Sequence, residues 1–254
     1  MFTAQNYVRV QSLEEAWSLN QKKSNRILGG GCWLRLGRQR IGTLIDLSDL
    51  GLGTIRREGD TLLLGAMVTL RQLETSALLQ ECYGSFFPHM VESIVGVQFR
   101  NCATLGGSVA GRFGFSDLLT GLLAVDSQVC LVKGGVMPLA RYLSLPPSRD
   151  VVAEIRLPAS GWKASYQSFR NTHTDLPVLT CAVARRDGEA AFQVSVGARP
   201  ARAVLLTDVT GETLACQLDQ LSYGSNMRAG EAYRRHLAPV LAARAIEELE
   251  VKQG

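Results

Sequence analysis

The sequence predicts an α+β fold, and three observations support this. Expected helices and strands are mixed along the chain without the regular β-α-β alternation of a doubly wound sheet. Strand-like apolar runs follow one another between residues 151 and 197. Residues 229–251 are rich in alanine, leucine and charged side chains, which favours a long helix or two at the end of the chain. At 254 residues, the chain is long enough for two or three lobes.

The first half of the chain mixes short apolar runs with segments of helical spacing. Leu13, Ala16 and Trp17 form an apolar face after the cap candidate Ser12, which predicts a helix over residues 12–22. Short apolar runs predict strands at residues 26–28, 44–47, 61–66 and 129–132. Further helices are expected after a cap near Thr69, at residues 86–95 and at residues 117–125.

Two prolines interrupt this pattern before the second half begins. Pro146-Pro147-Ser148 separates the last strand of the first half from a strand expected at residues 151–157. Three more strands are expected at residues 164–169, 178–184 and 192–197, and the helical segment 229–251 follows. Arg186-Asp187-Gly188 predicts a tight turn between the last two of these strands.

Composition excludes several classes of protein. The net charge of +4 is scattered, without the basic run of a nucleic-acid-binding surface. The six cysteines form no C-x-x-C pair, which argues against zinc or an iron–sulfur cluster and favours free, buried thiols. The N-terminus lacks the features of a secretory signal, and no apolar run reaches the roughly 18 residues of a membrane span. We therefore expect a cytoplasmic protein.

Two glycine-rich segments carry the functional signal. Gly29-Gly30-Gly31 follows the apolar pair Ile27-Leu28, and Thr104-Leu105-Gly106-Gly107-Ser108 follows the pair Arg100-Asn101, which could brace the second segment or reach a phosphate. Glycine allows backbone N–H groups to approach an anion closely, so the two segments together suggest a dinucleotide held at its pyrophosphate. A tight turn and a glycine-rich bend are the structural alternatives. Leu34 occupies the third glycine position of G-x-G-x-x-G, so a Rossmann site is not expected.

The order of these segments resembles the flavin-binding subunit or domain of molybdenum hydroxylases, of the xanthine dehydrogenase and carbon monoxide dehydrogenase types. The resemblance extends over nearly the whole chain. It is carried by residues 12–16 with 27–31, 98–108 with 116–118, Phe169-Arg170, residues 197–203 and residues 232–237. Ser108 stands where that family usually has asparagine, and Cys32-Trp33 replaces small polar residues.

The resemblance implies an FAD-binding domain over residues 1–157, PCMH-like, with lobes of about 1–55 and 56–157, and a C-terminal domain of antiparallel strands and helices over residues 158–254. FAD would lie between the first two lobes. The Thr104 hydroxyl and the neighbouring glycine N–H groups would contact its pyrophosphate. Asp117 would face ribityl or ribose hydroxyls; alternatively, Ser116 or Asp117 only caps a helix. Arg170 would lie near the flavin ring, or on the surface. The implied cofactor-binding residues are Leu28, Gly29, Gly30, Gly31, Cys32, Trp33, Ala103, Thr104, Gly106, Gly107, Ser108, Asp117 and Arg170.

The implied function is that of an oxidoreductase subunit without catalytic side chains of its own. It would pass electrons between a [2Fe–2S] and molybdopterin partner and an acceptor such as NAD or quinone, within a hetero-oligomer. Two other classes remain open from the sequence: a degenerate structural or assembly subunit that has lost flavin, and a stand-alone flavin reductase or oxidase. A yellow colour of the purified protein separates the flavin-binding classes from the structural one.

Overall fold

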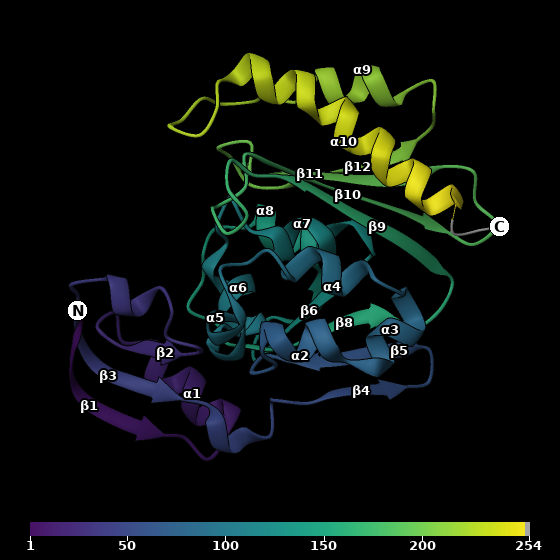
Figure 1. The fold of residues 1–254 in the computed structure, drawn as a ribbon. Helices are drawn as coiled ribbons and strands as arrows, with labels where there is room; N and C mark the ends of the chain where they lie inside the picture. Colours follow the sequence, from purple (N-terminus) through teal and green to yellow (C-terminus); the bar gives the residue numbers. More distant parts are fainter. Residues whose placement is uncertain (252–254) are drawn as a thin grey trace.

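The structure, a computed structural model, describes residues 1–251 and consists of three sheets with helices around them (Figure 1). We name the three units after their position in the chain: the N-terminal, middle and C-terminal lobes, each containing one sheet. The predicted α+β class is therefore confirmed. The expected domain boundary at residue 157 falls near the end of the last strand of the middle sheet and stays a prediction; residues 252–254 of the expected C-terminal domain lie outside the described residues.

The N-terminal lobe is a small parallel sheet covered by one helix. The strands β1 (Thr3–Arg9), β3 (Arg40–Asp46) and β2 (Arg26–Leu28) are neighbours in that order, and both outer strands run parallel to β3. Helix α1 (Leu13–Asn20) begins at Ser12, whose side chain accepts a hydrogen bond from the Glu15 N–H. The single-turn helices η1 (Leu34–Leu36) and η2 (Ser48–Leu50) complete this lobe.

The middle lobe is a five-stranded antiparallel sheet with helices on it. The strand order is β4 (Ile55–Glu58), β5 (Thr61–Gly65), β8 (Val152–Pro158), β6 (Gln128–Leu131) and β7 (Gly135–Pro138). The helices are α2 (Leu70–Thr75), α3 (Ala77–Tyr83), α4 (Phe86–Val91), α5 (Val97–Cys102), α6 (Leu105–Gly111), α7 (Asp117–Ala124) and α8 (Leu139–Ser144). The apolar core that they share is the largest in the molecule as described.

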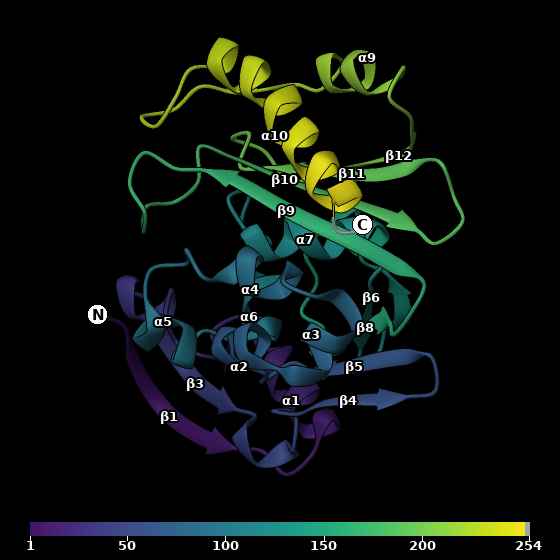
Figure 2. The ribbon, with the colours of Figure 1, turned by 45° about the vertical axis from the view of Figure 1, so that its right-hand side comes forward.

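The C-terminal lobe is an antiparallel sheet lying between α7 and a long helix (Figure 1, Figure 2). Its strands are β12 (Val204–Val209), β11 (Phe192–Gly197), β10 (Leu179–Arg186) and β9 (Trp162–Phe169), in that order, and its helices are α9 (Leu214–Asp219) and α10 (Glu231–Val251). Cys181 and Val183 of β10 pack toward α10, whereas Ala182 and Ala184 belong to the core on the α7 side. Because both faces are buried, this strand is a continuous apolar run rather than an alternating one.

The sequence located most elements but missed several. Strands β1, β4, β7 and β12 and helices α5, α6, α8 and α9 were not expected. The helix predicted at residues 86–95 ends at Val91, and that predicted at residues 12–22 ends at Asn20. Within the described part of the chain, no helix combines the length and apolar character needed to cross a membrane.

Candidate functional site

A cavity of about 630 Å³ lies where the three lobes meet. Its wall includes the first glycine segment from the N-terminal lobe, the second from the middle lobe, and Asp175 and Leu176 from the loop between β9 and β10. Every residue of the predicted cofactor-binding set except Leu28 and Arg170 lines this cavity. The size is in the range of small-molecule and cofactor sites.

The two glycine segments lie directly against each other. A Cβ on Gly30 would lie 1.8 Å from the carbonyl oxygen of Cys102, and a Cβ on Gly29 would lie 2.7 Å from Oγ1 of Thr104. Neither backbone could approach its neighbour this closely with a larger residue. The glycines of the first segment therefore serve the contact between lobes as well as the shape of the cavity.

The first segment also presents donors that no protein group accepts. Among the residues that the structure describes, the backbone N–H groups of Gly30, Gly31, Cys32 and Trp33 have no acceptor. Gly31 has φ +68°, a conformation that glycine adopts without strain and that helps successive N–H groups converge. We call these four groups the donor nest, and this arrangement suits an anion such as a pyrophosphate.

The second glycine segment differs from its expectation. Gly106 and Gly107 lie in the first turn of α6, with Thr104 as its N-cap, and not in an open loop. Their N–H groups already donate within the protein, from Gly106 to the Ala66 carbonyl at 2.8 Å and from Gly107 to Thr104 Oγ1 at 3.2 Å. The prediction that these N–H groups are free for a pyrophosphate is thus corrected. What the segment offers is space, because Gly107 is exposed in the cavity wall and a Cβ there would meet only Thr104 Oγ1, at 3.0 Å.

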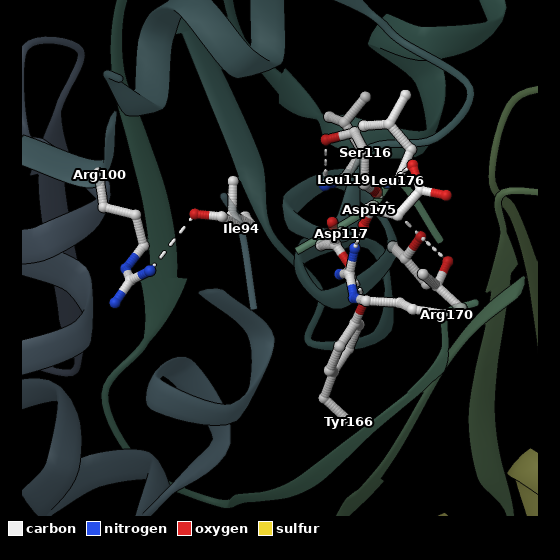
Figure 3. Close-up of polar contacts among 11 residues, drawn as sticks. Ile94, Arg100, Ser116, Asp117, Leu119, Tyr166, Arg170, Asp175 and Leu176 are labelled. Carbon is white, nitrogen blue, oxygen red and sulfur yellow. Dashed lines mark hydrogen bonds and ion pairs between the residues drawn. The ribbon is translucent and has the colours of Figure 1, made fainter. Parts of the chain in front are cut away.

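A buried ion pair joins Asp117 of the cavity wall to Arg170 behind it (Figure 3). Asp117 begins α7, which Ser116 caps by accepting a hydrogen bond from the Leu119 N–H at 3.2 Å. The Asp117 carboxylate accepts hydrogen bonds from Arg170 Nη2 and from the Tyr166 hydroxyl, both on or next to β9. Burial raises the pKa of Asp117, and the Arg170 guanidinium opposes that rise.

Arg170 is neither a surface residue nor part of the cavity lining. Its side chain is 7% exposed, and Nη1 donates to the Asp175 carbonyl at 2.6 Å, which fixes the loop that covers the cavity. Its Nε is buried without an acceptor. Asp175 in turn pairs with Arg228 at 2.9 Å, and this neighbouring guanidinium lowers the pKa of the Asp175 carboxyl.

Two other sequence predictions, for Arg100 and for the cysteines, can be compared with the structure. The sequence left Arg100 open as a brace or a phosphate contact. Its side chain is buried and pairs with Glu74 at 2.8 Å, so it braces α5 against α2. Its Nη1 also donates to the Ile94 carbonyl (Figure 3). Of the six free cysteines, only Cys181 is buried, and Cys102 and Cys216 are exposed, which corrects the expectation of buried thiols. Within residues 1–251, no three His, Cys, Asp or Glu side chains gather where a metal ion could bind.

The comparisons with known proteins agree with this geometry. Residues 2–160 match the family model described as the FAD binding domain in molybdopterin dehydrogenase. The chain belongs to this family. Its relatives include the uncharacterized protein YgfM of Escherichia coli, 26% identical over 94% of both chains, and the carbon monoxide dehydrogenase medium chain of Hydrogenophaga pseudoflava, 30% identical over 56% of this chain and 53% of that one. A solved structure of carbon monoxide dehydrogenase from H. pseudoflava has the same fold, with a TM-score of 0.85, 22% identity and 99% of both chains covered.

As a member of this FAD-binding family, the chain has FAD as its cofactor, and the residues present fit it. The donor nest matches a pyrophosphate, the open face of Gly107 leaves room beside it, and apolar side chains form most of the remaining wall. Sequence reasoning missed wall residues contributed by distant segments, among them Leu70, Ile94, Val95, Phe99 and Asp175. Local sequence gave no signal for these because only the packing of the lobes brings them together.

Proposed function

We propose that this chain is the flavin subunit of a molybdenum hydroxylase-like complex and transfers electrons within it. Electrons would reach the flavin from an iron–sulfur subunit, which a molybdopterin subunit supplies, and would leave to an acceptor such as NAD or a quinone. The family match and a relative named as the medium chain of carbon monoxide dehydrogenase support this proposal. In this proposal residues 1–157 form the FAD-binding domain, with lobes of about 1–55 and 56–157, and the chain from 158 on forms the second domain.

The observation that carries the proposal is the donor nest in the wall of a cavity between lobes. Four successive N–H groups without acceptors in the protein can hold negative charge, and the pyrophosphate of FAD would provide it. From this anchor the dinucleotide would extend along the cavity, past the exposed Gly107. Asp117 faces the same cavity, and its buried partner Arg170 holds it in place.

FAD supplies the redox chemistry, because its ring system accepts and releases one or two electrons. The protein residues have other tasks. Gly30 to Trp33 hold the pyrophosphate, and the apolar wall around Ile94 and Phe99 excludes water. Arg170 holds Asp117 in place and fixes the covering loop through the Asp175 carbonyl.

Two measurements test the proposal. The purified protein, or the protein after incubation with FAD, should show a flavin absorption spectrum at about one FAD per chain. Affinity purification from the native cell, followed by mass spectrometry, should recover an iron–sulfur subunit and a molybdopterin subunit. A colourless protein that does not take up FAD would instead indicate a structural or assembly subunit. Full turnover of an organic substrate by the isolated chain would indicate a stand-alone flavoenzyme.

A further inference from the structure

Three aromatic side chains meet in the wall of the cavity. Trp33 comes from the first glycine segment, and Phe113 and Phe115 come from the connection between α6 and α7. Their ring centroids are 5.0 Å apart for Trp33 and Phe113, 5.4 Å for Trp33 and Phe115, and 5.2 Å for the two phenylalanines. We call these residues the aromatic triad.

The surrounding backbone is built to hold these rings. A Cβ on Gly111 would lie 2.6 Å from the ring of Phe113, and a Cβ on Gly114 would lie 2.8 Å from the Ala201 carbonyl oxygen. Glycine at both positions therefore lets the short segment between α6 and α7 fold back and place its two phenylalanine rings against each other. Their planes differ by only 14°, so the two rings are stacked on each other, and Trp33 packs at an angle against both.

Trp33 remains 44% exposed despite its contacts with both phenylalanines. Much of the indole is thus uncovered in a concave site, where a planar ring can stack on it and bury apolar area. Its backbone N–H belongs to the donor nest, and Phe115 is only two positions from Asp117 in the sequence. The triad therefore shares the cavity wall with both the donor nest and Asp117.

We propose that the aromatic triad stacks on the isoalloxazine ring of bound FAD, with Trp33 as the principal contact. This inference rests on the proposed function, because it takes FAD as the ligand. The isoalloxazine is the assigned ring because its polar edge needs partners, and Asp117, two positions from Phe115 in the sequence, lines the same cavity. If the triad instead fills space that FAD would need, removing the Trp33 side chain would strengthen FAD binding.

The test compares Trp33→Ala and Trp33→Phe with the wild-type protein, and Trp17→Phe serves as the control. Trp17 lies in the N-terminal lobe, where Lys133 Nζ lies 5.2 Å from its ring centroid, and it does not line the cavity. Each apoprotein is titrated with FAD, and the dissociation constant and the fluorescence of the bound flavin are measured. Thermal unfolding of each apoprotein confirms that the variants fold.

We expect Trp33→Ala to weaken FAD binding about tenfold or more, the usual effect of removing one aromatic ring from a stacked base. Trp33→Phe should retain most of the affinity. An indole stacked on the isoalloxazine quenches its emission, so bound flavin should be brighter in both Trp33 variants and unchanged in Trp17→Phe. ADP, which lacks the isoalloxazine, should bind the wild type and Trp33→Ala equally.

Three results would overturn the inference. Unchanged affinity and emission in Trp33→Ala would remove Trp33 from the ring contact, and tighter binding would make it an obstruction. A loss of ADP affinity equal to the loss of FAD affinity would assign Trp33 to the adenine. If the wild type itself binds no FAD, the proposed function fails, and that outcome is distinct from the other three.

Discussion

The ion pair between Asp117 and Arg170 offers a quantitative test of how the lobes are joined. Asp117→Asn keeps the shape of the side chain but leaves the guanidinium charge without a partner. Both side chains are 7% exposed, and Nε of Arg170 already lacks an acceptor, so water cannot take over the lost interaction. Breaking a buried pair in this way costs about 3–5 kcal/mol. For a chain of this length, that corresponds to a fall in Tm of roughly 10 °C.

The matched control is the same change in an exposed pair. Asp49 pairs with Arg9, but their side chains are 39% and 53% exposed, so Asp49→Asn should cost less than about 1 kcal/mol. The assay is thermal and urea unfolding of the apoprotein, which avoids any contribution from bound flavin.

A double-mutant cycle completes the test. Arg170→Met should also be strongly destabilising, since it strands the Asp117 carboxylate and removes the donor to the Asp175 carbonyl. The double variant should lose less free energy of unfolding than the sum of the single variants, by about 2 kcal/mol. If Asp117→Asn costs no more than Asp49→Asn, or if the effects of Asp117→Asn and Arg170→Met simply add, the buried pair does not stabilise the contact between the lobes.

Further predictions concern glycines, titrating side chains and the cofactor. Gly30→Ala should disrupt folding, since its Cβ would lie 1.8 Å from the Cys102 carbonyl oxygen. Gly107→Val should instead leave Tm nearly unchanged and abolish FAD binding. Measuring the Tm and flavin content of both variants checks this, and a stable Gly30→Ala protein would contradict it. Burial raises the pKa of Tyr223 from 10 to about 12, so its contribution to stability is complete below pH 10 and is lost as the pH rises toward 12, which unfolding measured against pH should show. A thiol reagent should label the exposed Cys102 and Cys216 quickly. Cys181 should react only on unfolding, because it is buried and burial raises the pKa of its thiol to about 12. Rapid labelling of Cys181 would show that β10 opens. Acid precipitation should release FAD into the supernatant, and flavin retained in the pellet would indicate a covalent link.

Elements with local signals could be predicted from the sequence. Ser12, Ser116 and Thr69 cap α1, α7 and α2, as their side chains and the following apolar spacing indicated. The strands of the C-terminal sheet were found because each is a short apolar run. By contrast, β1 is almost wholly exposed and carries polar residues, and it exists because its backbone pairs with β3. No side-chain pattern could have indicated it.

The candidate site was predictable where it depended on glycine and unpredictable where it depended on packing. The two glycine segments were recognised, but their different uses were not. Gly106 lies in a helix although two adjacent glycines disfavour one. Glycine is needed at this position because a Cβ there would lie 2.7 Å from the Cβ of Ala66. In the same way, the charge of Arg100 suggested a phosphate contact, whereas its half-buried partner, Glu74, lies 26 residues away in the sequence.

The position of the cavity among the three lobes makes cofactor retention a property of the whole chain. The residues Trp33, Thr104 and Leu176 come from different lobes. A ligand that contacts all three therefore links the lobes, and no single lobe provides the whole binding site. A ligand present at a hundredfold its dissociation constant adds about 2.7 kcal/mol to the stability of the form that binds it. Bound FAD would therefore stabilise the contacts between the lobes in addition to carrying the redox chemistry. The apoprotein would be less stable than the FAD-bound chain even before it assembles with any partner.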